Sequence, residues 1–456
     1  MPFPYRSYRL GLDLLRRGTF LLGPLLVNPE TKLTRGVRGR QGVIERLRRW
    51  AEDERKRELP LVWFHAPSVG EGLQARVVME VLRREAAPLQ VAYTHFSPSA
   101  QGLAERMPAE VADYLPWDTL GQVRAALDAL QPTLLVFTKT EVWPVLAREA
   151  RRRGIPVVLV AATLPPDAGR LRFPARVLLR PVFGELDRVL TISSDDGRRF
   201  IRLGVDPSRI GITGDPGIDS ARTRALKIDP DAPYLAPFHR APRPTVVAGS
   251  TWSADEAVLL PALERLRATI PELRLVIAPH EPTAPHLARL EEALDEGGWA
   301  PARLGEVEER GSVDGVAAVV VDRVGVLAPL YTVGSAAFVG GGFHRHGLHS
   351  VLEPAAVGCP VVFGPRHANA RAAGELIRAG GAHEVADDHE LSDTLAQWLT
   401  PPERGRAAGK RAEGYIRQHA GAALETVREL LRLLPGRDSP TGSDIHVSKE
   451  CEYDDR

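Results

Sequence analysis

The stretch best suited to chemistry is a glycine-rich turn between a predicted strand and a predicted helix. Residues 336–339 are expected to form a buried strand, and Gly340, Gly341 and Gly342 follow it directly. Glycines let the backbone approach a ligand closely, and the free amides and dipole of a helix N-terminus favour negative charge. The next helix carries Glu353, whose carboxylate can accept hydrogen bonds from a sugar diol. The pattern predicts a nucleotide-sugar site, with phosphate at the glycines and ribose near Glu353.

The same pattern has a purely structural interpretation. Glycine-rich turns between strands and helices occur in many α/β proteins that bind nothing there. Glu353 is then an ordinary helix glutamate, followed by a structural Pro354. Motifs elsewhere in the chain are needed to decide between the two interpretations.

Two glutamates in the N-terminal half each follow a predicted strand. Glu71 lies in HAPSVGEG (65–72), and Glu141 lies in KTEVWP (139–144). Ligands of open α/β sheets bind at the carboxyl edge of the strands. A carboxylate at that edge can act as general base towards a hydroxyl nucleophile. The alternative for each is a glutamate that only complements a helix dipole.

Length and composition limit the class of protein. A chain of 456 residues predicts two domains of roughly 200 residues each. The net charge of +1 provides no global field for nucleic acid. Two cysteines, Cys359 and Cys451, without ligand spacing argue against a zinc site or a disulfide framework and agree with a reducing compartment.

Positive charge is concentrated at the N-terminus. Residues 1–60 contain fourteen Lys and Arg against seven Asp and Glu, a net charge of +7. The apolar run FLLGPLLV (20–27) is shorter than the roughly 20 residues that span a bilayer. An apolar segment flanked by arginines indicates monotopic contact with an anionic membrane surface over residues 1–30. The alternative is a basic helical arm that packs on its own domain.

From Leu61 onward, short β-rich runs alternate with helical stretches, which predicts parallel α/β sheets. We expect an N-terminal acceptor-binding domain over 31–227 and a proline-rich linker over 228–244. A C-terminal nucleotide-sugar domain with closing helices should follow over 245–434, and a disordered tail over 435–456. Two Rossmann-like domains facing across a cleft are the simplest result.

The motifs, taken in order, resemble the 3-deoxy-D-manno-octulosonic acid (Kdo) transferases of lipopolysaccharide synthesis, which have the GT-B architecture. The resemblance covers roughly residues 8–420. The matching blocks are RGVRGRQG (35–42), FHAPSVGEG (64–72), YTHFSPSAQG (93–102), YLPWD (114–118), KTEVWP (139–144), GSTWSADE (249–256), APHEP (278–282), GVLAPLY (325–331) and GLHSVLEPAAVGCPVVFGP (347–365).

This resemblance implies transfer of Kdo from CMP-Kdo to a hydroxyl of the lipid A precursor (lipid IVA), with inversion and without metal or cofactor. It implies a peripheral or monotopic enzyme on the cytoplasmic face of the inner membrane. Glu71 matches the family's catalytic base, and Glu141 matches the acidic residue credited with assisting the transition state. The blocks implied to bind CMP contain Ser250, Thr251, Pro279, His280, Gly325, Val326, Leu327, Gly341, Gly342, His349, Ser350 and Glu353.

The chain departs from the family pattern at three places. Gly217 stands where the family has a lysine or arginine, with Arg222 and Arg224 as nearby substitutes. Ser350 replaces an asparagine, and His280-Glu281 replaces an Arg-His pair. Two alternatives follow. One is a GT-B transferase that uses a UDP-sugar, such as a lipid A disaccharide synthase. The other is a catalytically weakened paralogue that binds lipid A precursor or CMP.

Overall fold

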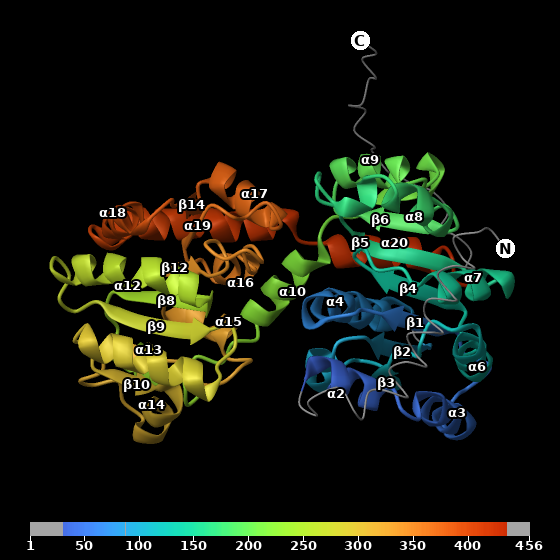
Figure 1. The fold of residues 1–456 in the computed structure, drawn as a ribbon, viewed down its shortest axis with the longest axis horizontal. Helices are drawn as coiled ribbons and strands as arrows, with labels where there is room; N and C mark the ends of the chain where they lie inside the picture. Colours follow the sequence, from blue (N-terminus) through green and yellow to red (C-terminus); the bar gives the residue numbers. More distant parts are fainter. Residues whose placement is uncertain (1–30, 87, 436–456) are drawn as a thin grey trace, which may run out of the picture. The chain divides into compact units, whose positions relative to one another are not determined.

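The chain folds into two α/β units, each built around a parallel sheet of seven strands, in a computed structural model that describes residues 31–86 and 88–435 (Figure 1). Helices lie beside both sheets. The predicted fold class, α/β with two Rossmann-like domains, is confirmed. The membrane segment predicted at 1–30 lies outside the described residues, as does the predicted tail beyond residue 435.

The first unit runs to Thr163, continues over Gly169–Thr213 and resumes at Leu424. Its sheet has the order β3-β2-β1-β4-β5-β6-β7. The strands are β1 (Leu61–His65), β2 (Gln90–His95), β3 (Val111–Tyr114), β4 (Leu134–Thr138), β5 (Val157–Ala162), β6 (Arg188–Thr191) and β7 (Ile210–Ile212). The helices are α2 (Lys32–Gly39), α3 (Val43–Asp53), α4 (Val69–Ala86), α5 (Gln101–Ala104), α6 (Leu120–Leu130), α7 (Pro144–Arg152), α8 (Ala175–Phe183), α9 (Ser194–Arg202) and α20 (Ala422–Leu431).

The second unit comprises Leu164–Ala168 and Gly214–Ala423. Its sheet has the order β10-β11-β9-β8-β12-β13-β14. The strands are β8 (Thr245–Thr251), β9 (Arg274–Pro279), β10 (Pro301–Arg303), β11 (Ala318–Val320), β12 (Ala336–Val339), β13 (Val361–Phe363) and β14 (Ala382–Glu384). The helices are α10 (Pro216–Ala225), α11 (Ala236–Arg240), α12 (Ser253–Arg267), α13 (Ala284–Glu296), α14 (Leu304–Arg310), α15 (Leu327–Leu330), α16 (Leu352–Ala356), α17 (Arg371–Ala379), α18 (Asp388–Leu399) and α19 (Pro402–His419).

The strands are parallel because their sequences are apolar on both faces. All five residues of β1 and all six of β5 are buried. In β8, Val246 and Ala248 enter one hydrophobic core, and Val247 between them enters the core on the opposite face. Sheets covered on both sides by helices bury both faces of every central strand, which is the usual setting of parallel pairing.

Each sheet has one topological switch point, where successive connections begin to wind in the opposite direction. In the first unit it lies between β1 and β4, which pair directly. In the second unit it lies between β8 and β12, which also pair directly. Loops that leave two such strands diverge to opposite sides and open a crevice at their carboxyl ends. The fold therefore offers one ligand position in each unit.

The unit boundaries fall at other places than the predicted domain limits. The second unit begins at Gly214, and the stretch predicted as a linker, 228–244, contains α11 with the buried side chains of Leu235 and Phe238. The last helix, α20, belongs to the first unit: Glu429 pairs with Arg188 of β6 at 3.3 Å. Figure 1 shows this red helix among the green elements of that unit.

No helix among residues 31–86 and 88–435 has both the length and the apolar character needed to cross a membrane.

Candidate active site

Glu71 and Lys139 meet at the switch point of the first sheet. Glu71 lies in the first turn of α4, directly after β1, and Lys139 directly follows β4. Their Oε1 and Nζ atoms are 3.5 Å apart, and the Glu71 side chain is 17% exposed. Lys139 has a φ of +69°, a left-handed conformation that non-glycine residues rarely adopt and that recurs at functional sites. The other carboxylate oxygen of Glu71, Oε2, is buried without a hydrogen-bond partner among the described residues.

Glu141 is the second carboxylate of this edge. Burial raises its pKa above the usual glutamate value, and the nearby charge of Glu71 raises it further. Arg170 and Arg40 act in the opposite direction. A carboxyl group with a raised pKa is protonated more readily and can then donate a hydrogen bond. The structure thus brings the two predicted glutamates within electrostatic reach of one another.

A partly buried aromatic cluster includes Trp143, which follows Glu141 in the chain. Trp143 donates its indole N–H to Nε2 of His65 at 3.0 Å and stacks on Phe96 with ring centroids 5.1 Å apart. Burial lowers the pKa of His65 to about 3, so the imidazole is neutral and can accept. Arg40 lies 3.9 Å from the centroid of Phe96 and donates to the carbonyl oxygens of Phe96 and Leu115. The roles of Arg40 and His65 were not predicted, although both lie inside the matching blocks.

The predicted donor residues of the second unit gather at its own switch point. Ser250 and Thr251 end β8, and the glycines follow β12, its neighbour in the sheet. A Cβ on Gly340 would come within 2.3 Å of the Ser250 carbonyl oxygen, and one on Gly342 within 2.5 Å of the Gly364 nitrogen. These glycines are needed for the close approach of backbone to backbone.

The remaining donor candidates also lie around this edge. Pro279 ends β9, and His280 follows it; Gly325 and Val326 precede α15, which begins at Leu327. A Cβ on Gly249 of β8 would come within 2.8 Å of the Leu327 side chain, which places α15 against this strand. The remaining candidates are Gly341, His349 and Ser350 in the loop after β12 and Glu353 in α16.

Asp255 holds the glycine loop, and the sequence did not point to it. Its fully buried carboxylate accepts hydrogen bonds from the backbone N–H groups of Gly341 (2.8 Å), Phe343 (3.1 Å) and Trp252 (2.9 Å). The Gly340 N–H donates to the Gly249 carbonyl oxygen at 2.8 Å. Three amides at this loop are therefore already engaged, whereas the glycine pattern predicted that they would be free for an anion.

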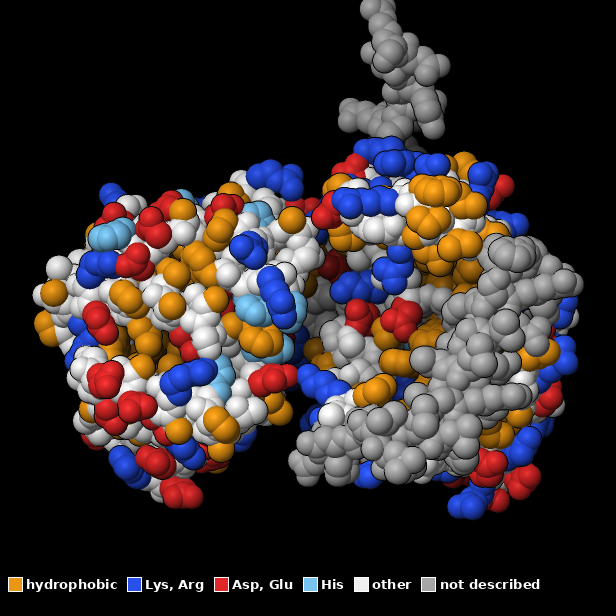
Figure 2. All heavy atoms as spheres, in the orientation of Figure 1, with side chains coloured by type: hydrophobic (Ala, Val, Ile, Leu, Met, Phe, Trp, Pro, Cys, Tyr) orange, Lys and Arg blue, Asp and Glu red, His pale blue; other side chains and the backbone are white. Residues whose placement is uncertain are grey.

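Histidines surround one tryptophan in the second unit, and Figure 2 shows histidine side chains gathered on one face of that unit. The Trp252 ring stacks on His344 at 4.4 Å and on His280 at 4.6 Å. Its indole N–H donates to Nε2 of His349 at 3.0 Å, and His349 stacks on His280 at 4.4 Å. Burial, with the neighbouring histidines, lowers the pKa of His349 to about 4. The accepting Nε2 places the ring proton of His349 on Nδ1, which can donate to a ligand.

This neutral imidazole should make the protein less stable in mild acid. Between pH 6.5 and 4, His349 is protonated in the unfolded chain but neutral in the folded chain. The free energy of unfolding therefore falls as the pH is lowered. We expect a loss of ~2–3 kcal/mol relative to His349→Gln, after discounting for partial exposure. Urea unfolding of both proteins from pH 7.5 to 4 measures it. A constant difference between them across that range would contradict the lowered pKa.

Arg224 and Glu353 form an ion pair between α10 and α16. Nη1 of Arg224 lies 2.8 Å from Oε1 of Glu353, and both side chains are partly buried. The Nε atom of Arg224 is buried with no hydrogen-bond partner in the described part of the chain. Gly217, two turns earlier on α10, is buried. Arg222 and Arg224 are the two candidates to replace the family's cation at Gly217. Arg224 pairs with Glu353, whereas Arg222 is exposed.

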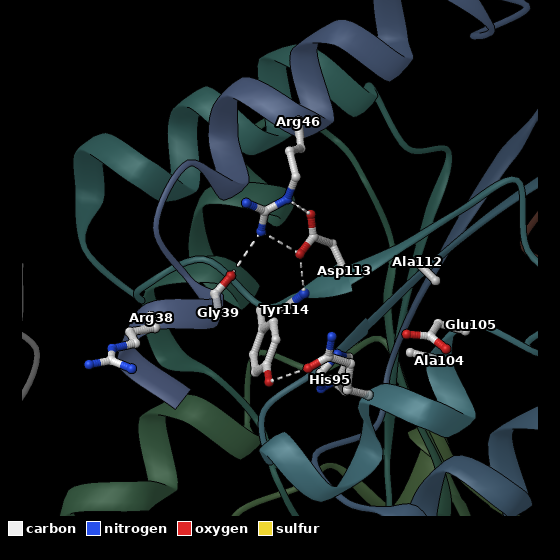
Figure 3. Close-up of a pocket in the computed structure, with 10 residues that line it drawn as sticks. Arg38, Gly39, Arg46, His95, Ala104, Glu105, Ala112, Asp113 and Tyr114 are labelled. Atoms are coloured by element: carbon white, nitrogen blue, oxygen red, sulfur yellow. Dashed lines mark hydrogen bonds and ion pairs between the residues drawn. The ribbon is translucent and has the colours of Figure 1, made fainter. Parts of the chain in front are cut away.

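A separate pocket of about 400 Å³ lies in the first unit (Figure 3). Its carboxylate, Asp113, accepts two hydrogen bonds from the Arg46 guanidinium, at 2.6 and 2.7 Å, and a third from the Tyr114 N–H at 2.7 Å. Arg46 also donates to the Gly39 carbonyl oxygen. The Arg46 guanidinium and the Asp113 carboxylate therefore hold α3 against β3. The pocket has no part in the chemistry proposed for Glu71 and Glu141.

The described residues contain no group of three or more His, Cys, Asp or Glu arranged to hold a metal ion. The tryptophan–histidine cluster is an aromatic stack and not a ligand set.

Known proteins resemble the chain over most of its length. Residues 41–220 match the family model described as 3-deoxy-D-manno-octulosonic-acid transferase (kdotransferase). The 3-deoxy-D-manno-octulosonic acid transferase of Bordetella pertussis is 30% identical over 391 residues, covering 81% of this chain and 86% of the relative. The chain belongs to the Kdo transferase family. The transferase of Haemophilus influenzae is 25% identical, with coverages of 81% and 86%. The protein is thus a glycosyltransferase, as the motifs predicted.

Solved structures agree on the fold. The UDP-GlcNAc 2-epimerase of Neisseria meningitidis, bound to UDP-GlcNAc, superposes with a TM-score of 0.59 at 15% identity and covers 82% of this chain and 99% of that one. A glycosyltransferase of Rickettsia africae gives a TM-score of 0.56 at 9% identity, with coverages of 83% and 100%. This confirms the predicted two-domain GT-B class.

Proposed function

We propose that the protein transfers Kdo from CMP-Kdo to a hydroxyl of the lipid A precursor, lipid IVA, at the cytoplasmic face of the inner membrane. The transfer inverts the anomeric carbon and needs no metal. The observation that carries the proposal is the Glu71–Glu141 pair at a sheet switch point in a chain of this family.

Glu71 is suited to be the general base. One of its carboxylate oxygens faces Lys139, and the other is buried with no partner among the described side chains and backbone groups. In the proposed step the acceptor hydroxyl attacks the anomeric carbon, and Glu71 takes its proton. The bond between that carbon and the phosphate oxygen breaks, and CMP leaves with the electron pair. Attack on the face opposite the leaving group produces inversion.

Glu141 has a different role because its pKa is raised. A carboxyl group that is protonated more easily can donate a hydrogen bond towards developing negative charge. Trp143, two residues later, is fixed by His65 and Phe96, so the segment that carries Glu141 is held rigidly. Rigid placement is what lets such groups act without reorganisation.

Arg224 is proposed as the cation that meets the CMP phosphate, in place of the lysine or arginine that the family carries at the position of Gly217. Its buried, unpartnered Nε and its ion pair with Glu353 support this role, within the residues that the structure describes. A guanidinium can bind a carboxylate and a phosphate oxygen together because its five N–H groups point in different directions.

Arg224→Ala should weaken CMP binding ~10–100-fold, since a hydrogen bond to a charged group contributes about 1.5–3 kcal/mol. Arg224→Lys should retain part of the affinity. Titration calorimetry with CMP measures both. Arg222→Ala, an exposed arginine on the same helix, is the matched control and should bind CMP normally. Equal affinities for the Arg224 and Arg222 alanine variants would remove Arg224 from the donor site.

Turnover of CMP-Kdo on lipid A precursor, measured with and without EDTA, tests the function as a whole. The expected result is product formation at the same rate with and without EDTA. Loss of activity with EDTA, restored by magnesium, would contradict metal independence. Binding of CMP without any turnover would support the weakened paralogue, and turnover only with a UDP-sugar would support the other transferase.

A further inference from the structure

One surface of the first unit combines exposed apolar and basic side chains. It is formed by α8 and the residues just before it. Phe173 is 84% exposed, Val177 55% and Leu178 49%. Around them lie three further exposed side chains of one type, Arg172, Arg176 and Arg180. We call these six residues the α8 surface.

The C-terminal end of α8 is packed into the first unit. Val182 and Phe183 of α8 are buried, and the Phe183 ring lies 5.8 Å from the Phe200 ring of α9. Leu171, just before the helix, is also buried. The segment that carries Phe173, Val177 and Leu178 is therefore anchored to the fold at both ends. Large exposed apolar groups that lie together commonly mark an interaction surface.

The charge of this surface is of one sign. From residue 169 to 184 the sequence contains four arginines and no aspartate or glutamate. None of these arginines forms an ion pair with any residue that the structure describes. Other arginines of the same unit do form ion pairs: Arg198 of α9 pairs with Asp195, and Arg46 pairs with Asp113. Figure 2 shows hydrophobic and basic side chains together at the end of the first unit that carries α8 and α9.

We propose that the α8 surface binds the headgroup region of an anionic lipid bilayer. The arginines complement the phosphates of anionic lipids, and each basic residue close to such a surface contributes measurably to binding. Phe173, Val177 and Leu178 would enter the boundary between headgroups and acyl chains, as apolar side chains of amphipathic helices do. This contact is measured without any transfer reaction, so its failure leaves the proposed function standing.

The test is co-sedimentation of the full chain with vesicles of phosphatidylglycerol and phosphatidylcholine, and with vesicles of phosphatidylcholine alone. The triple variant Arg172→Glu/Arg176→Glu/Arg180→Glu should bind the anionic vesicles on the order of 100-fold more weakly. The triple variant Phe173→Ser/Val177→Ser/Leu178→Ser should lose at least about tenfold. Arg170 is left unchanged in both, because it acts on Glu141.

A charge-matched control separates local contact from net charge. Arg404, Lys410 and Arg417 are exposed on α19 of the second unit, and changing all three to Glu alters the net charge by the same amount. This control should bind vesicles almost as the unaltered chain does. Circular dichroism melting checks that all variants fold.

Two results would overturn the proposal. One is a loss below twofold in both α8 variants, or a loss that the α19 control equals. The other is a dimer of the unaltered chain, seen by sedimentation velocity without lipid, that the α8 variants convert to monomer. The surface would then be an interface between two copies of the chain.

Discussion

Glu71→Gln is expected to lower the rate of Kdo transfer by ~10²–10⁴-fold, the usual contribution of a general base. The amide has almost the same shape as the carboxylate but cannot take the acceptor proton. CMP affinity and the melting temperature should not change, because Glu71 lies in the first unit and the proposed CMP residues lie in the second.

The reason for so large an effect lies in the environment of the carboxylate. Its Oε2 atom is buried and has no partner among the described groups, so it is available to an acceptor hydroxyl. Glu141, the other carboxylate of this edge, has a raised pKa and is proposed to donate a hydrogen bond instead. Single-turnover rates at saturating CMP-Kdo measure the chemical step directly.

Glu80→Gln is the matched control for this experiment. Glu80 lies on the same helix and is paired with Arg76 at the surface, so the same chemical change there should leave the rate unaltered. If the Glu71→Gln protein turned over at close to the normal rate, Glu71 would have no place in the mechanism. A large loss of melting temperature would instead assign it a structural role.

The sheets could be predicted because the signal for them is local. Runs such as LVWF and VVLVAA are apolar at every position, as is typical of strands that are buried on both faces. The two catalytic candidates could be placed for the same reason. Each lies in the segment that follows a strand, and the carboxyl ends of parallel strands share one edge.

Features set by distant parts of the chain could not be predicted in the same way. The pattern of α20 shows which of its faces is apolar, but not which sheet that face covers; the pairing of Glu429 with Arg188 decides this. Likewise, a histidine before an Ala-Pro pair gives no sign that His65 will accept a hydrogen bond from Trp143, which lies 78 positions further along the chain.

The glycine loop is the most instructive case. The run of glycines predicted a close approach of backbone and ligand, whereas the structure shows that the close approach is to neighbouring backbone. The amides of Gly341 and Phe343 are bound by Asp255, 86 and 88 positions away. The local pattern specified the conformation of the loop correctly and left its partner unspecified.

Asp255→Ala is expected to lower the free energy of unfolding of the second unit by ~3–5 kcal/mol. Three backbone N–H groups would lose their acceptor, and a buried donor left without a partner costs about 1–3 kcal/mol. Domains are stable by only about 5–15 kcal/mol, so the effect is large. Urea unfolding, followed by the fluorescence of Trp252 and the other tryptophans, measures it.

Asp255→Asn makes the prediction sharper. The amide oxygen can replace Oδ2 and keep the bonds from Trp252 and Gly341, but the NH₂ group would then face the Phe343 N–H. The loss should be about a third of that of the alanine variant, by the same cost for each unpaired amide. Asp393→Ala, at an exposed position of α18, is the control and should stay within about 0.5 kcal/mol of the unaltered protein. If Asp255→Ala were as stable as this control, water or a rearranged loop would satisfy the three amides. The loop could then open to present them to an anion, as its glycine pattern first predicted.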